Sequence, residues 1–150
     1  MSEKGLCMRL VTICTDGACS CNPGIGGWAV SLTARPKDVD RIRTRFISGY
    51  ENDTTNNRME LMAAIRGLEV LKEPCRVVLH SDSQYLVKTM TKGWSRKKNH
   101  DLWASLDELS RIHDIDWQWV RGHSTHAGNN KVDELAVRAI RERGGVDYYS

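Results

Sequence analysis

The sequence predicts an α/β fold with one mixed five-stranded sheet, an antiparallel meander followed by parallel strands, flanked by helices. In the first half, three β-prone segments follow one another with no helical segment between them, which favours antiparallel pairing. In the second half, amphipathic helical stripes alternate with short apolar runs, which favours parallel strands. The 150 residues are 40% hydrophobic and 27% charged, a globular balance. We expect residues 1–150 to form one domain, with a core over about 9–143 and short terminal tails.

The antiparallel half of the sheet is expected to use strands over residues 10–15, 28–34 and 42–50. A stretch rich in glycine, with asparagine and proline, covers residues 17–27 and predicts a loop after the first strand. Residues 35–38 (RPKD) predict the turn between the second and third strands.

The second half begins with an apolar stripe at helical spacing, formed by Leu61, Ala64, Ile65, Leu68 and Leu71. Pro74 ends that helical segment. The expected elements that follow are a strand over 76–80, helices over 83–91 and 101–111, a strand over 115–120 and a final helix that includes 132–140.

Composition excludes several classes of protein. The apolar runs, such as residues 77–79, are far too short to span a membrane, and the N-terminal segment has no signal or transit pattern. We therefore expect a cytoplasmic protein with no membrane partner. Five cysteines with no zinc-ligand spacing favour reduced thiols over a metal site or disulfides. A net charge of +3 does not identify a nucleic-acid-binding protein, although residues 92–100 (KGWSRKKNH) combine four cations with a tryptophan.

Four acidic residues lie where they could form a functional site. Asp16 and Asp82 directly follow apolar strands, and Glu60 and Asp133 fall in the first turns of amphipathic helices. Each acid alone also has a structural interpretation: an Asx turn at Asp16, a capping box between Asn57 and Glu60, a helix cap at Asp82 and a helix-dipole contact at Asp133.

The coincidence of four acids beside one sheet edge favours a shared role. Carboxylates gathered there would repel one another unless a cation held them together, and hard divalent cations such as Mg²⁺ prefer oxygen ligands. Two such ions can stabilise the attacking and leaving oxygens of a phosphoryl transfer. The residues alone therefore predict a carboxylate metal site, with a basic segment available for a polyanion.

The chain resembles type 1 ribonuclease H, in order, over about residues 9–140. The matching segments are TDGA at 15–18, NPG at 22–24, TTNNRMEL at 54–61, SDSQY at 81–85, DLW at 101–103, WVRGH at 119–123 and DELA at 133–136. The resemblance implies a ribonuclease H-like fold and an endonuclease that cuts the RNA strand of an RNA/DNA hybrid, leaving 5′-phosphate and 3′-hydroxyl ends.

The same resemblance implies a catalytic set. Its metal ligands would be Asp16, Glu60, Asp82 and Asp133, with Asp16 bridging two Mg²⁺ ions and Mn²⁺ as an alternative metal. One ion would activate water and the other would stabilise the leaving 3′-oxygen. His123 matches a loop histidine that assists proton transfer or product release. The alternative is that His123 and His126 form a solvent-exposed pair.

Residues that match nucleic-acid contacts in relatives are Asn22, Asn56, Asn57 and Gln84 for the minor groove and ribose 2′-hydroxyls, and Thr55 for a DNA-strand phosphate. An amide both donates and accepts, as recognition of a 2′-hydroxyl requires. Turn and cap roles are the alternatives for Asn22 and Asn57.

The sequence also departs from the family pattern. Asp53 stands where some relatives carry an arginine, so we expect weaker binding of the DNA strand. Residues 90–100 are too short for the basic protrusion of many bacterial members. Lys97 and Lys98, with Lys92 and Arg96, would partly replace that protrusion, and Trp94 would pack on the sugar-phosphate backbone. The alternative is a solvated charged surface with Trp94 in the core.

Two other functions stay open at this point. The chain could be a non-catalytic module that binds RNA/DNA hybrids, although no metal-ligand acid is lost. It could also cut another nucleic acid, because one fold serves several nucleases. We expect a monomer with no obligate protein partner, acting on an RNA/DNA hybrid.

Overall fold

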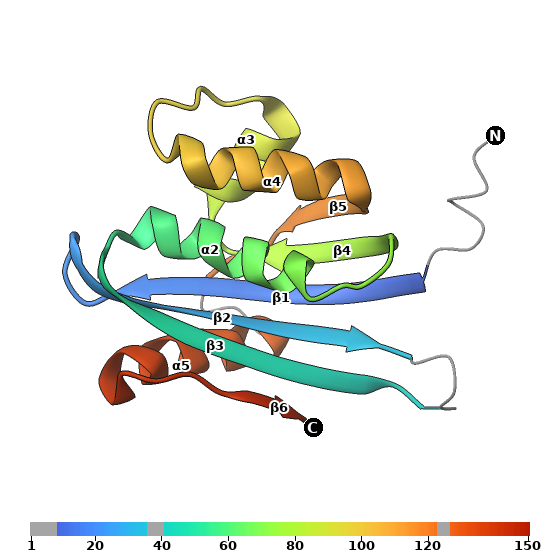
Figure 1. Cartoon of the computed structure of the whole chain (residues 1–150), viewed down its shortest axis with the longest axis horizontal. Coiled ribbons are helices and arrows are strands. Elements are labelled where there is room, and N and C mark those ends of the chain that lie inside the picture. Colours follow the sequence, from blue (N-terminus) through green and yellow to red (C-terminus); the bar gives the residue numbers. More distant parts are fainter. Residues whose placement is uncertain (1–8, 36–40, 123–126) are drawn as a thin grey trace.

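The computed structural model describes residues 9–35, 41–122 and 127–150. Over these residues the chain forms a six-stranded mixed sheet, in the order β5-β4-β1-β2-β3-β6, and four helices (Figure 1). The strands are β1 (Arg9–Cys19), β2 (Gly24–Ala34), β3 (Arg43–Thr54), β4 (Cys75–Ser81), β5 (Asp114–Trp119) and β6 (Asp147–Tyr149). The helices are α2 (Asn56–Glu69), α3 (Gln84–Lys92), α4 (His100–Ile112) and α5 (Ala127–Glu142). The α/β fold class is confirmed, with one strand more than expected.

The antiparallel meander has a tighter first turn than the sequence predicts. Strand β1 continues to Cys19 and β2 already begins at Gly24, so most of the expected loop over 17–27 is strand. Gly27 lets β2 pack closely against α5, because a Cβ there would overlap the carbonyl oxygen of Ala136. The expected turn at 35–38 falls largely on residues 36–40, which lie outside the described residues.

The parallel strands bring their ends to one edge of the sheet. Strand β4 pairs with β1 so that Ser81 lies opposite Thr15, and β5 pairs with β4 so that Trp119 lies opposite Ser81. Residues that follow these positions therefore meet at the same edge, as expected for parallel strands.

The unexpected sixth strand is formed by the C-terminal residues and pairs antiparallel with β3. Arg45 donates to both carboxylate oxygens of Asp147, at 2.9 and 2.8 Å, and the Phe46 and Tyr148 rings stack with centroids 5.2 Å apart. Three residues are too few to show an alternating pattern, so the sequence could not reveal this strand.

Helices cover the two faces of the sheet. Because successive strand residues point to opposite faces, Ile13 packs in the cluster that includes α2 and α4, and Cys14 packs under α5. Figure 1 shows α2 and α5 on opposite sides of the strands, with α3 and α4 beyond α2. Each cysteine in the described part of the chain is a free thiol. Among the described residues, no helix is both long and apolar enough to cross a membrane.

Candidate functional site

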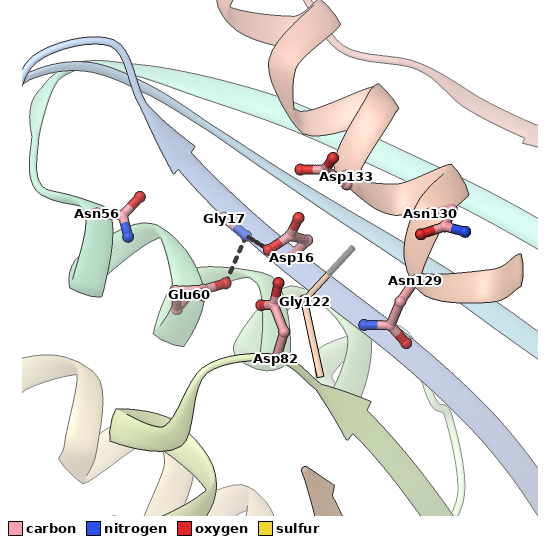
Figure 2. Close-up of a pocket in the computed structure, with 9 residues that line it drawn as sticks. All are labelled: Asp16, Gly17, Asn56, Glu60, Asp82, Gly122, Asn129, Asn130 and Asp133. Atoms are coloured by element: carbon pink, nitrogen blue, oxygen red, sulfur yellow. Dashed lines mark hydrogen bonds between the residues drawn. The ribbon is translucent and has the colours of Figure 1, made fainter. Parts of the chain in front are cut away.

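Four carboxylates line one cavity of about 150 Å³ at the edge of the sheet (Figure 2). Asp16 comes from β1, Glu60 from α2, Asp82 from the residue after β4, and Asp133 from α5. The remaining lining residues are Gly17, Asn56, Gly122, Asn129 and Asn130. The structure thus brings together all four acids that the sequence analysis selected, from four separate elements.

Three of these acids are close enough to share one cation. Asp16, Glu60 and Asp82 each offer a carboxylate oxygen, and these oxygens lie within 4.8 Å of one another. Asp16 is only 4% exposed and Glu60 only 7% exposed. Asp133 faces Asp16 from α5 on the other side of the cavity (Figure 2).

The start of α2 directs Glu60 into the cavity. Thr55 is the N-cap of this helix, and its hydroxyl oxygen accepts from the Arg58 N–H at 3.2 Å. Glu60 accepts from the backbone N–H of Gly17 at 2.7 Å. The predicted capping box between Asn57 and Glu60 is therefore wrong, because the helix begins earlier and Glu60 bonds to β1 instead.

The other structural interpretations of the acids also fail. Strand β1 runs through Asp16, whose carboxylate accepts from the Gly17 N–H at 2.9 Å, so Asp16 is not in a turn. Ser83, not Asp82, caps α3 by accepting from the Leu86 N–H at 3.1 Å. Helix α5 already includes Ala127, so Asp133 lies beyond its first turn and too far from its start for a strong dipole contact.

The electrostatics of the cavity favour a cation. Burial raises the pKa of Asp16, and the nearby carboxylates of Glu60 and Asp82 raise it further. Burial, followed by the charge of Asp82, raises the pKa of Glu60. Without a cation the cluster therefore retains protons at pH values where an exposed carboxyl group is ionised. Oxygen donors at this spacing fit a hard divalent cation, which would replace those protons.

His123 and His126 lie outside the described residues. The residue before His123, Gly122, does line the cavity, and a Cβ there would lie 3.1 Å from Oδ2 of Asp82. The segment that leads to His123 thus reaches the carboxylate cluster.

The expected nucleic-acid contacts fall into two groups around the cavity. Asn56 lines the cavity, and its backbone N–H donates to the side-chain oxygen of Asn22 at 2.9 Å. Asn22 therefore also fixes the start of α2, beside the cap at Thr55. Asn57 and Gln84 are exposed near the starts of α2 and α3.

The basic segment between α3 and α4 is partly exposed. Trp94 is 46% exposed, so the interpretation of Trp94 as a core residue is wrong. Lys97 and Lys98 are exposed. Arg96 instead donates to Asp107 at 2.7 Å, so its charge already has an internal partner.

Asn129 and Asn130 are cavity residues that the sequence analysis missed. Asn129 is 7% exposed, and both amides enter the cavity from the first turn of α5 (Figure 2). The available signal was helical spacing, because residues four and three positions before Asp133 share its face of the helix.

Comparison with known proteins identifies relatives that match most of the chain. The RNase H family profile matches residues 8–141. A protein named ribonuclease H from Novosphingobium aromaticivorans is 47% identical over 145 residues, which cover 88% of this chain and 97% of the relative. A ribonuclease H from Legionella pneumophila (strain Lens) is 50% identical, with the same shares covered.

Solved structures of RNases H share the fold. LC9-RNase H1, described as a type 1 RNase H with the type 2 active-site motif, matches with a TM-score of 0.78 and 34% identity over 94% of this chain and 78% of that one. LC11-RNase H1, solved in complex with an RNA/DNA hybrid, matches with a TM-score of 0.71 and 24% identity, over 89% of this chain and 98% of that one.

Proposed function

The chain belongs to the RNase H family, and from this membership we propose that it is an endonuclease that hydrolyses the RNA strand of RNA/DNA hybrids. The observation that carries the proposal is the convergence of four acids from separate elements in one cavity. We further propose that cleavage depends on two divalent cations, Mg²⁺ or alternatively Mn²⁺, and leaves 5′-phosphate and 3′-hydroxyl ends.

In this proposal, Asp16, Glu60, Asp82 and Asp133 hold the cations. When bound, the cations supply positive charge that stabilises the attacking and leaving oxygens of the phosphodiester. The Gly17 N–H holds the carboxylates of Asp16 and Glu60 in place by donating to both. His123 takes up a proton or assists release of the product, since an imidazole titrates near neutral pH.

Substrate selection in this proposal depends on amide side chains near the cavity. Asn56, Asn57 and Gln84 contact ribose hydroxyls in the minor groove, and the amide nitrogen of Asn22 joins them. Thr55 contacts a phosphate of the DNA strand.

The exposed segment between α3 and α4 would supply a second contact with the hybrid. Trp94, Lys97 and Lys98 lie against its sugar-phosphate backbone in this proposal. We also propose that residues 1–150 act as one catalytic domain, as a monomer in the cytoplasm, without an obligate protein partner.

The direct test uses labelled RNA/DNA hybrid with Mg²⁺, beside all-RNA and all-DNA duplexes of the same sequence. We expect cleavage of only the RNA strand of the hybrid, abolished by EDTA. Asp16→Asn and Asp133→Asn should abolish cleavage and keep the fold. Asp114→Asn is the matched control, because Asp114 is exposed on β5 and does not line the cavity.

Two results would refute the proposal in different ways. Full activity of Asp16→Asn would refute the assignment of the carboxylates. Tight binding of the hybrid with no product in Mg²⁺ or Mn²⁺ would support a non-catalytic hybrid-binding module instead. Equal cutting of the all-DNA duplex would refute the RNA-strand specificity.

A further inference from the structure

Trp119 is the last residue of β5, the outer strand beside β4 (Figure 1). Its side chain is 39% exposed, yet its indole N–H donates to the backbone carbonyl oxygen of Asp82 at 3.1 Å. The parallel register places Trp119 opposite Ser81, so this side chain reaches one residue past the end of β4. The indole N–H is the only polar group of a tryptophan side chain, and here it is used in this bond.

The backbone around Asp82 is held on both sides by the end of β5. The Val120 N–H donates to the carbonyl oxygen of Ser81 at 2.9 Å, and the Trp119 indole holds the next carbonyl oxygen. The peptide group that contains the Asp82 carbonyl also contains the Ser83 N–H, which donates to the hydroxyl oxygen of Ser81 at 3.0 Å. The two peptide groups that flank the Cα of Asp82 are therefore fixed by bonds that do not involve its carboxylate.

Asp82 depends on this support more than its neighbours do. Asp16 and Glu60 are buried and share the Gly17 N–H, whereas Asp82 is only half-buried and sits where the strand has already ended. The orientation of its carboxylate toward Asp16 and Glu60 (Figure 2) thus follows from the peptide groups on either side.

We propose that Trp119 is a positioning residue that holds Asp82 at the metal-binding geometry by donating its indole N–H to the Asp82 carbonyl oxygen. The inference rests on the proposed function, because it assigns Asp82 as a metal ligand. Trp119 is not among the described residues that line the cavity, so its proposed effect on the metal is exerted through the backbone of Asp82.

The test compares Trp119→Phe with wild type by titrating Mn²⁺ into each protein and measuring free Mn²⁺ by electron paramagnetic resonance. Phenylalanine keeps an aromatic ring and removes the N–H. Groups that orient metal ligands typically change metal affinity by about 10-fold or more when removed. We expect about 10-fold weaker Mn²⁺ binding, a matching rise in the Mg²⁺ concentration for half-maximal activity, and an unchanged KM for the hybrid.

Trp117→Phe is the matched control, because Trp117 lies on the same strand and face but packs against the core cluster. Urea unfolding in EDTA should show that both variants fold. A purely structural role for Trp119 would predict that both variants lose stability and that neither variant changes the Mn²⁺ affinity. Wild-type Mn²⁺ affinity in Trp119→Phe would therefore overturn the inference.

A measurement on the wild-type protein covers the case in which Trp119→Phe does not fold. The Trp119 indole N–H resonance should exchange slowly with solvent despite its exposure, and it should shift when Mg²⁺ is added. Fast exchange with no shift would overturn the inference. If wild-type protein binds Mn²⁺ but cuts no hybrid, only the proposed activity fails; if it binds no Mn²⁺, both fail.

Discussion

Replacing Asp16 with asparagine should make the metal-free protein more stable. Asp16 is almost fully buried beside two other carboxylates, and each pair of charges at this site repels. Asparagine has nearly the same shape and keeps an oxygen that can accept from the Gly17 N–H, as Asp16 does. Its amide group can also donate to Glu60 or Asp82. The substitution therefore removes a carboxyl group that must either carry a repelled charge or retain a proton, and it leaves the packing in place.

The spacing of the carboxylates sets the size of the effect. Two unit charges 4.8 Å apart repel by about 3.5 kcal/mol at an effective dielectric constant of about 20. Because burial and repulsion raise the pKa of Asp16, part of the cluster is protonated at neutral pH and only part of this repulsion operates. We expect the free energy of unfolding to rise by about 1–3 kcal/mol, a Tm increase of about 3–10 °C for a chain of this size.

The assay is thermal unfolding, followed by circular dichroism at pH 7.5, in EDTA and again in Mg²⁺. In Mg²⁺ the advantage of Asp16→Asn should shrink or reverse, because the cation stabilises the wild-type carboxylates and binds more weakly to a site in which an amide replaces one of them. The control is Asp114→Asn, which changes an exposed acid and should leave the Tm within about 1 °C. An Asp16→Asn protein no more stable than wild type in EDTA would refute the repulsion argument.

Three further predictions concern other parts of the molecule. Because the pKa of Glu60 is raised in the folded state, metal-free wild type should lose stability relative to Glu60→Gln as pH rises from about 4.5 through the raised value. The measurement is urea unfolding at several pH values, and a stability difference between the two proteins that is independent of pH would contradict the prediction. The double variant Lys97→Ala/Lys98→Ala should raise the KM for the hybrid, leave the Tm unchanged and lower the slope of log affinity against log salt concentration by about 1–2. An unaltered slope would exclude phosphate contacts by these two lysines. Gly27→Ala should lower the free energy of unfolding by about 1–3 kcal/mol, because its Cβ would overlap the Ala136 carbonyl oxygen, and chemical denaturation should detect the loss.

Several elements were predictable because their patterns are local. The stripe that includes Leu61 and Leu68 depends only on helical periodicity, and both residues are fully buried in α2. The meander was similarly predictable, because three β-prone segments follow one another with no helical segment between them. The helix start was less certain, because Thr55 and Asn57 are both good cap residues and only the folded backbone selects Thr55.

The basic segment illustrates what local patterns leave open. Trp94 and Arg96 are two residues apart, yet Trp94 is largely exposed and Arg96 pairs with Asp107 in α4. The sequence placed both in one basic, aromatic stretch. Only the packing of α4 beside that stretch decides which side chain faces solvent.

Apart from the three-residue strand β6, the sequence by itself determined the kinds of elements, their order and the four candidate acids, because each depends on residues close together in the chain. The tertiary structure decided the partners: Glu60 bonds to Gly17 across 43 positions, and Arg45 bonds to Asp147 across 102. It also placed the Trp119 indole on the Asp82 carbonyl oxygen. These contacts depend on strand register and helix packing, which many distant residues set together, and no short segment specifies them.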